Sequence, residues 1–351
     1  MNDQSQLLLL SMGDPCGVGP ELIWKLWLHH RDELGPCCVV GHPQAMARAA
    51  TAVQAHGYPI HVVSSVSEAA QFWAEPSTLA PDQPLVVVAI EPGAPLPEWA
   101  VVSADAGRLA ALSIEAAARA CLRGEAAALV TAPIHKQALS LAGWDVPGHT
   151  ELLQQLAAEH LAVTVQDVPV RMMLANPELQ TVLHSIHMPL REALQAISVD
   201  SVVETLRITH QHVPAMGSHG LRIALAGVNP HAGEGGLFGD EEVRILAPAV
   251  AKAHQQGWAV FGPLSPDTVF MRARQGEFDV VVAMYHDQGL IPVKYMGVED
   301  GVNVTLGLPF IRTSPDHGTA FDLAGKGTAD VRSMREAVRW ARRAAAAGDS
   351  H

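Results

Sequence analysis

Short apolar runs alternate with longer Ala- and Leu-rich stretches along most of the chain. The runs have the length of buried strands, and the longer stretches repeat apolar positions at helical spacing. Strands are predicted at 7–11, 39–41, 85–90, 127–131, 171–175, 181–184, 222–227 and 280–284, and helices at 21–29, 43–56, 104–123, 150–159, 201–211, 241–256 and 330–347. This alternation indicates βαβ units around a mainly parallel sheet, the α/β class.

The length of the chain, 351 residues, affects how these units are grouped. Single hydrophobic cores stop growing at roughly 250–300 residues, so we expect two doubly wound α/β domains with a cleft between them. Hydrophobic residues make up 48% of the chain and charged residues 17%, which favours a globular protein over a disordered one.

Charge and segment length exclude several classes of partner. The net charge is -13 and no Lys/Arg cluster interrupts it, which argues against a nucleic-acid partner. The longest apolar runs are strand-sized, and the first one lacks the length and basic flank of a signal peptide. We therefore expect no membrane association and a cytoplasmic location. The four cysteines, Cys16, Cys37, Cys38 and Cys121, have no metal-site spacing and are expected to be buried thiols.

Polar, glycine-rich loops follow several of the predicted strands. Open α/β sheets bind ligands beyond the carboxyl ends of their strands, so these loops are where the chemistry is expected. The first, residues 13–21, holds three glycines before a helix. Neither this loop nor residues 233–236 match the G-x-G-x-x-G fingerprint of dinucleotide-binding loops. If NAD binds, it does so outside the Rossmann pattern.

Three histidines stand in such strand-exit loops: His187, His231 and His286. Imidazole binds zinc and related divalent ions, and three protein ligands leave positions open for a substrate. With 18 histidines in the chain, any single one is more often a surface or core residue; the shared loop context favours these three. His184 lies three residues before His187, which in an extended strand places it on the opposite face, so it is not expected to be a ligand.

A second group of polar residues follows His286: Lys294, Asn303 and Arg312. Arginine grips a phosphate or carboxylate with two hydrogen bonds, lysine adds a point charge, and asparagine adds neutral donors, so together they would form an oxyanion clamp. The alternative is that both cations pair with surface carboxylates. His149 and Thr150 precede a predicted helix, where Thr150 either helps to bind an anion or is a plain N-cap.

Six motifs taken together resemble the 4-hydroxythreonine-4-phosphate dehydrogenase family, and the likeness spans nearly the whole chain. The motifs are residues 13–21, Thr131-Ala-Pro-Ile-His-Lys136, Gly148-His-Thr-Glu151, Asn229-Pro-His-Ala-Gly-Glu-Gly-Gly236, Ala283-Met-Tyr-His-Asp-Gln-Gly289 and 301–320. The resemblance implies a fold like isocitrate and isopropylmalate dehydrogenases, with two α/β/α domains and a cleft. The first domain would comprise residues 1–131 plus about 305–351, and the second about 132–304, with the metal ligands and the dimer interface.

The resemblance also implies roles for individual residues. It implies that His187, His231 and His286 bind a divalent ion (Zn, Mg, Co or Mn), with ligands drawn from both subunits of a homodimer. It implies that His149, Thr150, Lys294, Asn303 and Arg312 contact the substrate, and that Asp267 and Asp287 support the site. The segment 316–330 is similar to the adenosine-binding loop of the isocitrate dehydrogenase group, which implies NAD or NADP binding by His317, Gly318, Thr319, Ala320 and Asp330.

The implied reaction belongs to vitamin B6 (pyridoxal 5'-phosphate) biosynthesis. It is NAD-dependent oxidation of 4-phosphooxy-L-threonine at the C3 hydroxyl, with decarboxylation to 3-amino-2-oxopropyl phosphate. Two alternatives stay open: a paralogue that oxidises a phosphorylated sugar acid (phosphothreonate or phosphoerythronate) or a dihydrodiol, and a metal-dependent hydrolase. The sequence leaves the native metal, the NAD or NADP preference and the general base open, although Lys294 is a candidate base.

Overall fold

Strands and helices alternate through most of the computed structural model, which describes residues 7–75, 83–215 and 219–348. The chain forms two compact units, one made of Met1–Pro169 with Leu308–His351 and the other of Val170–Gly307. The first unit is thus assembled from both ends of the chain. The α/β class is confirmed, and the first unit is discontinuous in sequence, as the predicted first domain is.

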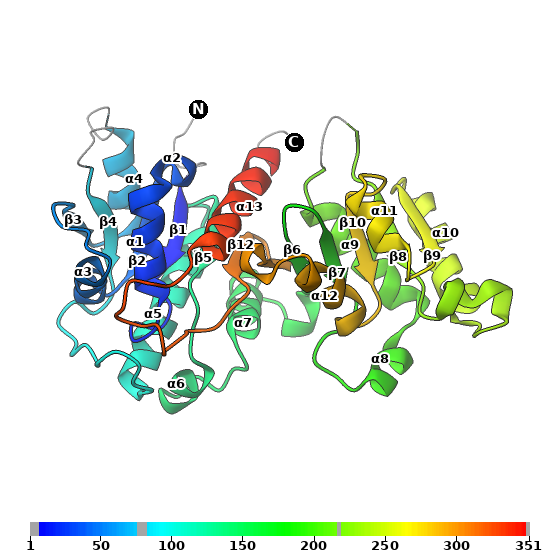
Figure 1. The fold of residues 1–351 in the computed structure, drawn as a ribbon, viewed down its shortest axis with the longest axis horizontal. Helices are drawn as coiled ribbons and strands as arrows, with labels where there is room; N and C mark the ends of the chain where they lie inside the picture. The colour runs from blue at the N-terminus through cyan, green and yellow to red at the C-terminus, as the bar shows by residue number, and fades with distance from the viewer. Residues whose placement is uncertain (1–6, 76–82, 216–218, 349–351) are drawn as a thin grey trace. The chain divides into compact units, whose positions relative to one another are not determined.

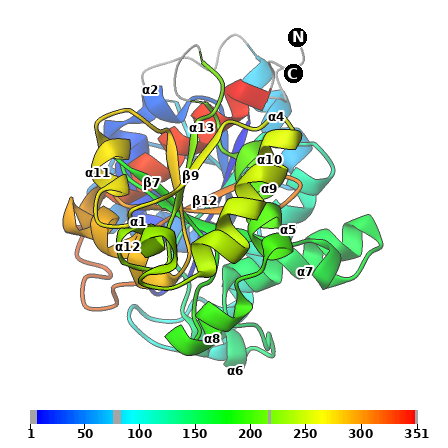
Figure 2. The same cartoon turned by 90° about the vertical axis from the view of Figure 1, so that its right-hand side faces the viewer.

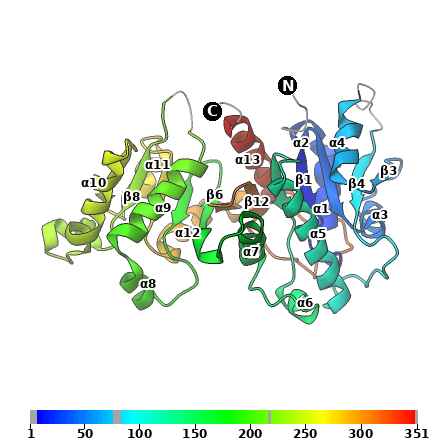
Figure 3. The same cartoon turned by 180° about the vertical axis from the view of Figure 1, so that it is seen from behind.

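The first unit is built on parallel strands in the order β3-β4-β2-β1-β5-β12. These strands are β1 (Leu8–Ser11), β2 (Cys37–Gly41), β3 (Ile60–Val63), β4 (Leu85–Ala89), β5 (Ala128–Thr131) and β12 (Ile311–Pro315). Its helices are α1 (Gly19–His29), α2 (Arg31–Leu34), α3 (Pro43–Ala52), α4 (Val66–Ala74), α5 (Ala104–Leu122), α6 (Lys136–Leu141), α7 (His149–Leu161) and α13 (Arg332–Gly348), with the turn η3 (Val165–Asp167). Figures 1 and 3 show α1 and α13 on one face of this sheet and α5 on the other.

Burial on both faces explains the unbroken apolar strands of this unit. Every residue of β1, β2 and β5 is buried, as expected where helices cover both sides of a parallel sheet. The long helix α5 begins where Ser103 Oγ accepts a hydrogen bond from Ala106 N, the usual capping arrangement. The four cysteines are buried and free, as predicted.

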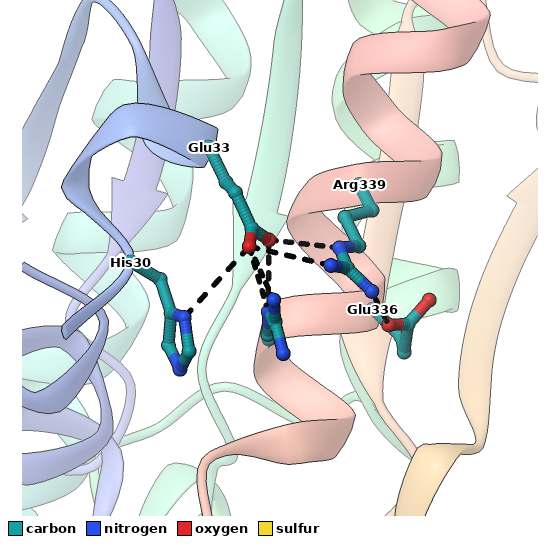
Figure 4. A network of polar contacts seen from close by, with 5 residues as sticks. His30, Glu33, Glu336 and Arg339 are labelled. Atoms are coloured by element: carbon teal, nitrogen blue, oxygen red, sulfur yellow. Dashed lines mark hydrogen bonds and ion pairs between the residues drawn. The ribbon is translucent and has the colours of Figure 1, made fainter.

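The C-terminal helix α13 packs on the N-terminal part of the chain. Its apolar side chains Met334 and Trp340 are buried, and two of its arginines, Arg335 and Arg339, face α2. Arg335 Nε and Arg339 Nε each donate to Glu33 Oε2 at 2.8 Å, and His30 lies 3.8 Å from the same carboxylate (Figure 4). Residues about 300 positions apart in sequence are thereby joined.

The second unit has a mixed sheet in the order β11-β6-β7-β10-β8-β9. Its strands are β6 (Arg171–Ala175), β7 (Gln180–Leu183), β8 (Ile223–Ala226), β9 (Val260–Leu264), β10 (Val280–Ala283) and β11 (Val302–Leu306). Its helices are α8 (Leu190–Ala196), α9 (Val199–His212), α10 (Ala247–Gln255), α11 (Val269–Arg274) and α12 (His286–Tyr295), with the turns η4 (Pro230–Gly236), η5 (Glu242–Leu246) and η6 (Val298–Asp300). In Figure 2, α9 and α10 lie on one side of this sheet and α11 and α12 on the other.

Part of this second sheet differs from the expected parallel arrangement. Strands β7, β10, β8 and β9 run parallel, but β6 pairs antiparallel with both β7 and β11. The turn between β6 and β7 is too short for a crossover: Asn176 N donates to Leu179 O at 2.9 Å, and the Asn176 side chain accepts from the backbone N–H of Glu178 and Leu179. A tight turn of this kind can join only antiparallel strands.

The first boundary between the units also differs from the prediction. We expected the second domain to begin at about residue 132, whereas residues 132–169 belong to the first unit. The reason is that α6 and α7 pack on α5: Trp144 Nε1 donates to Glu115 Oε1 at 2.7 Å, and Arg119 pairs with Glu159 at 3.0 Å. The second boundary, at 307/308, lies close to the expected 304/305. Within the described residues no helix is both long and apolar enough to cross a membrane.

Candidate functional site

Three neighbouring parallel strands of the second unit end at the same edge of the sheet. They are β7, β10 and β8, paired in that order. The loop after each one carries one of the predicted metal ligands: His187 follows β7, His286 follows β10 and His231 follows β8. The three histidine loops therefore start from one edge of this sheet.

Buried hydrogen bonds tie the three loops together. Ser185 Oγ donates to Met284 O at 2.9 Å and joins the His187 loop to the His286 loop. The Gln288 amide is used at both ends: its Oε1 accepts from Met284 N and its Nε2 donates to Gly227 O, each at 2.7 Å. Gln288 therefore links the His286 turn to the start of the His231 loop. Sequence reasoning missed it, because its side chain bonds only to backbone groups that folding brings near.

His187 and His286 lie side by side. Their ring centres are 5.6 Å apart and their ring planes are tilted by 45°. Both line an open pocket of about 240 Å³ with Asp287, Tyr285 and the apolar side chains of Ile186, Met188, Leu190 and Ala193. His286 Nδ1 is 2.7 Å from Asp287 Oδ1, which leaves Nε2 of the same ring for another partner. This is the contact through which Asp287, predicted to support the site, touches one of the predicted metal ligands.

His231 contacts neither His187 nor His286 in the set of ring contacts that joins those two. It is exposed, at the start of a left-handed turn, with its ring centre 6.2 Å from that of Phe238. No group of three or more His, Cys, Asp or Glu side chains able to hold a metal ion occurs among the described residues. Asp267 is also exposed and accepts a hydrogen bond from Ser265 Oγ at 2.6 Å. One chain thus brings together two of the three histidines.

His184 makes a different set of contacts, all consistent with a structural role. Its Nδ1 is 3.0 Å from Thr205 Oγ1 and its Nε2 is 3.4 Å from Ser201 Oγ, both on α9. Burial, together with the nearby charge of Arg171, lowers the pKa of His184 to about 4.

Arg312 and His149 come together in the first unit. Arg312 is 3% exposed on β12, and its Nη2 donates to Thr131 Oγ1 on the neighbouring β5 at 2.7 Å. Burial lowers its pKa to about 10, so the guanidinium stays charged at neutral pH. His149 begins α7 with Nε2 buried and without a hydrogen-bond partner, and burial, then the charge of Arg312, holds its pKa well below the usual range. The pair offers a buried cation beside a neutral imidazole.

The other predicted substrate residues are Thr150, Lys294 and Asn303. Helix α7 begins at His149 with Gly148 as its N-cap, so the plain N-cap reading of Thr150 is wrong and its hydroxyl stands inside the first turn. Lys294 is exposed on α12, and Asn303 is half-buried on β11, both in the second unit. The predicted clamp residues are therefore divided between the two units.

The predicted cofactor loop packs on the glycine-rich loop at residues 13–21. Val18 N donates to Thr319 O at 3.0 Å, and the Glu21 carboxylate accepts from Gly325 N at 2.5 Å and Gly327 N at 2.7 Å. His317 and Gly318 are exposed, Thr319 is buried, and Ala320 has a positive φ of 42°. Asp330 accepts from Arg332 at the entry to α13. Glu21 is the residue that fixes this loop, and its role could not be read from the sequence.

Comparison with known proteins adds four findings. A family model described as pyridoxal phosphate biosynthetic protein PdxA matches residues 33–341. The chain is 48% identical to a 4-hydroxythreonine-4-phosphate dehydrogenase of Beijerinckia indica subsp. indica, over 96% of this chain and 94% of that protein. It is 42% identical to a D-threonate 4-phosphate dehydrogenase of Salmonella typhimurium, over 96% and 98%. A solved 4-hydroxythreonine-4-phosphate dehydrogenase from Klebsiella pneumoniae superposes with a TM-score of 0.81 at 39% identity, covering 97% of this chain and 99% of that one.

Proposed function

The chain belongs to the PdxA family of pyridoxal phosphate biosynthetic proteins, and we propose that it oxidises 4-phosphooxy-L-threonine with NAD or NADP. The C3 hydrogen passes to the nicotinamide as hydride and the hydroxyl proton goes to a base. The electron pair of the bond to the carboxylate then moves towards the new carbonyl and carbon dioxide leaves. The enolate that remains takes up a proton at C2 and becomes 3-amino-2-oxopropyl phosphate. The observation that carries the proposal is the set of histidine loops on three adjacent strand ends, in a chain 48% identical to a dehydrogenase of that name.

The donor set fits a divalent metal ion. Two imidazoles bound to one tetrahedral zinc ion bring their ring centres to about 5 Å, from Zn–N distances of about 2.0–2.1 Å. His187 and His286 are 5.6 Å apart, and the Asp287 carboxylate holds His286 as carboxylates commonly hold metal-bound imidazoles. His231 is the proposed third ligand. When bound, the ion supplies Lewis-acid chemistry at the substrate hydroxyl and the carbonyl formed from it.

Since His231 is not grouped with the other two histidines, we propose that a homodimer completes the site. In this arrangement His187 and His286 come from one subunit and His231 from the other. Exposed apolar side chains on the His231 segment, Leu237 at 71% and Val243 at 55%, are consistent with a surface that a second subunit covers.

Arg312 is proposed to hold the phosphate end of the substrate, and His149 beside it is proposed to contact a substrate hydroxyl. The buried guanidinium donates one hydrogen bond to Thr131 Oγ1, which fixes its orientation. Its remaining N–H groups can form charge-assisted hydrogen bonds to phosphate, which are strong in buried surroundings. The neutral His149 ring offers Nε2 as an acceptor for a hydroxyl. Lys294 is exposed, so we assign it to phosphate binding, with Asn303 and Thr150 as neutral partners, and leave the base unassigned.

Cofactor binding is proposed at the loop that Glu21 fixes against residues 13–21. The exposed residues His317 and Gly318 and the positive-φ residue Ala320 form the accessible side of that loop, with Thr319 and Asp330 anchoring its ends. We also propose a cytoplasmic location for the protein.

The direct test is an assay of the purified protein with 4-phosphooxy-L-threonine, a divalent ion and NAD or NADP, followed by absorbance of the reduced cofactor. We expect turnover that excess chelator abolishes and that zinc, cobalt, manganese or magnesium restores. Undiminished turnover in chelator, with no metal detectable by elemental analysis, would remove the metal from the mechanism.

A second candidate substrate is D-threonate 4-phosphate, because a 42% identical relative carries that activity in its name. The two substrates share the phosphate and differ at C2, where one has an amino group and the other a hydroxyl. Measuring kcat/KM for both with the same enzyme preparation decides between them. We expect the amino compound to be preferred, and a higher kcat/KM for the threonate would reassign the substrate while keeping the site.

A further inference from the structure

The loop that carries His231 has an unusual backbone. Residues 231–235 all have left-handed helical angles, with φ values of 53°, 53°, 76°, 44° and 69°. Two of the five are glycines, but His231, Ala232 and Glu234 carry a Cβ atom, which makes this conformation unfavourable. Strained backbone of this kind persists only where the surroundings enforce it.

The buried carboxylate of Glu242 lies beneath this turn. It is 2% exposed and begins the turn η5. Its Oε1 accepts from the backbone N–H of Val228 and of Asn229, both at 2.7 Å, and its Oε2 accepts from Asn229 Nδ2 at 2.9 Å. Hydrogen bonds to an ionised acceptor are stronger than neutral ones. Glu242 therefore fixes the segment that enters the His231 turn.

The turn itself is seated on the same carboxylate through Gly233. A Cβ atom at Gly233 would lie 2.7 Å from Glu242 Oε2 and 2.8 Å from Gly239 O, closer than side chains allow. At Gly239 a Cβ atom would come within 2.3 Å of Asn229 Nδ2. Gly235, in the same turn with a similar φ, has nothing within 4 Å.

We propose that Glu242, acting through Asn229 and Gly233, is a positioning residue that holds His231 in its left-handed conformation and so sets the metal affinity of the site. This inference rests on the proposed function for the metal role of His231. Glu242 is not itself a metal ligand; it is the buried group that supports the exposed loop carrying His231.

Two glycine variants test the close contact between the His231 turn and Glu242. Gly233→Ala and Gly235→Ala place the same side chain at φ values of 76° and 69°, so both carry the same kind of backbone penalty, and only the first meets Glu242. Zinc affinity of the metal-free full-length protein is measured by titration calorimetry. We expect at least about tenfold weaker binding for Gly233→Ala, as for the loss of a residue that orients a ligand, and nearly unchanged binding for Gly235→Ala. Equal affinities of the two variants would overturn the proposal.

Glu242→Gln tests the carboxylate without changing its size. The glutamine keeps one oxygen for the backbone donors of Val228 and Asn229 but turns an amide N–H₂ group towards Asn229 Nδ2, so two donors face each other. We expect weaker zinc binding, and faster amide hydrogen exchange confined to residues 228–238. Glu234→Gln, which removes an exposed carboxylate from the same turn, is the control.

Hydrogen exchange also separates this proposal from the proposed function. If the wild-type protein binds no zinc, the metal site has failed, and exchange in the metal-free protein alone decides about Glu242. Faster exchange in Glu242→Gln at residues 228–238, with β8 and β10 unchanged, then supports the positioning role. Unchanged exchange there, or equal acceleration throughout the second unit, would refute it.

Discussion

Arg312 is the residue whose chemistry the structure defines most closely. It is almost fully buried, charged at neutral pH, and oriented by its hydrogen bond to Thr131 Oγ1. Lysine keeps the charge but loses the planar fork of donors, so Arg312→Lys is expected to raise KM for the phosphorylated substrate by about tenfold or more, with a smaller change in kcat. Steady-state kinetics measure both parameters.

Thr131→Ser is the matched control for this change, because it keeps the hydroxyl that accepts from Arg312. It should leave KM close to the wild-type value. If Arg312→Lys also left KM and kcat unchanged, Arg312 would have no part in phosphate binding.

His184 makes stability depend on pH. Its pKa is about 4 in the folded protein against 6.5 for a free histidine, so below pH 6.5 the unfolded chain takes up a proton that the folded chain does not. This group therefore lowers the free energy of unfolding as pH falls from 6.5 to 4, by about 3 kcal/mol in total, and has no effect above that range. His184→Gln should reduce this loss, as measured by urea unfolding at pH 6.5 and 4.5.

The exposed His160 on α7 provides the comparison for this experiment. His160→Gln should leave the difference between the two pH values as in the wild type. A His184→Gln protein that lost as much stability on acidification as the wild type would show that another group is responsible.

At the level of single residues, the sequence could indicate candidate metal-binding and anion-binding side chains where they follow an apolar strand. His187, His231 and His286 could be named because each follows an apolar strand. Gln288 and Glu242 could not, since both act through backbone N–H and C=O groups brought near by folding. No spacing in the sequence reveals such contacts.

Among the secondary-structure elements, α13 is joined to α2 through the Glu33 carboxylate, in addition to the hydrogen bond from Arg342 Nε to Leu34 O. Hydrogen bonds from Arg335, and then from Arg339, lower the pKa of Glu33 to about 2, against 4.5 for a free glutamate (Figure 4). The stabilisation is present above pH 4.5 and is lost as pH falls towards 2. Glu33→Gln is expected to lower the free energy of unfolding at pH 7 by about 1–2 kcal/mol, because the pairs form a network.

Thermal or urea unfolding at pH 7 and at pH 3 measures this effect. The difference between Glu33→Gln and the wild type should shrink at the lower pH. Asp32→Asn, an exposed neighbour on the same helix, should behave as the wild type at both pH values. A loss of stability in Glu33→Gln that is equal at pH 3 and pH 7 would exclude the ionic contribution.

Most elements with a regular apolar pattern were predictable, including α5 and the C-terminal helix. The direction of β6 was not, because its five residues read the same in a parallel or an antiparallel pairing. The turn at Asn176 decides between them, and its hydrogen bonds become visible only once the chain is folded. The boundary at 169/170 was missed for a similar reason, since the packing of α6 and α7 on α5 decides it.

The proposed shared site is a property of the whole molecule. If His187 and His286 come from one subunit and His231 from the other, a heterodimer of a His231→Ala chain and a His187→Ala chain has one intact site and one site with both lesions. Mixing the two inactive proteins and allowing subunit exchange should therefore restore up to about half of the wild-type activity per heterodimer.

A mixture of His187→Ala and His286→Ala chains is the control, because each site would then lack one of the two histidines that stand together. It should stay inactive. Equal recovery in both mixtures, or no recovery in verified heterodimers of folded chains, would contradict this division of the ligands.

The construction of the first unit from both chain ends has a consequence during synthesis on the ribosome. Strand β5 pairs with β1 on one side and with β12 on the other, and β12 and α13 are made after the whole second unit. Until β12 is made, β5 is an unpaired edge strand of the nascent first unit. The second unit, which is continuous in sequence, is by then complete. The second unit can mature first, and the C-terminal segment then closes the first.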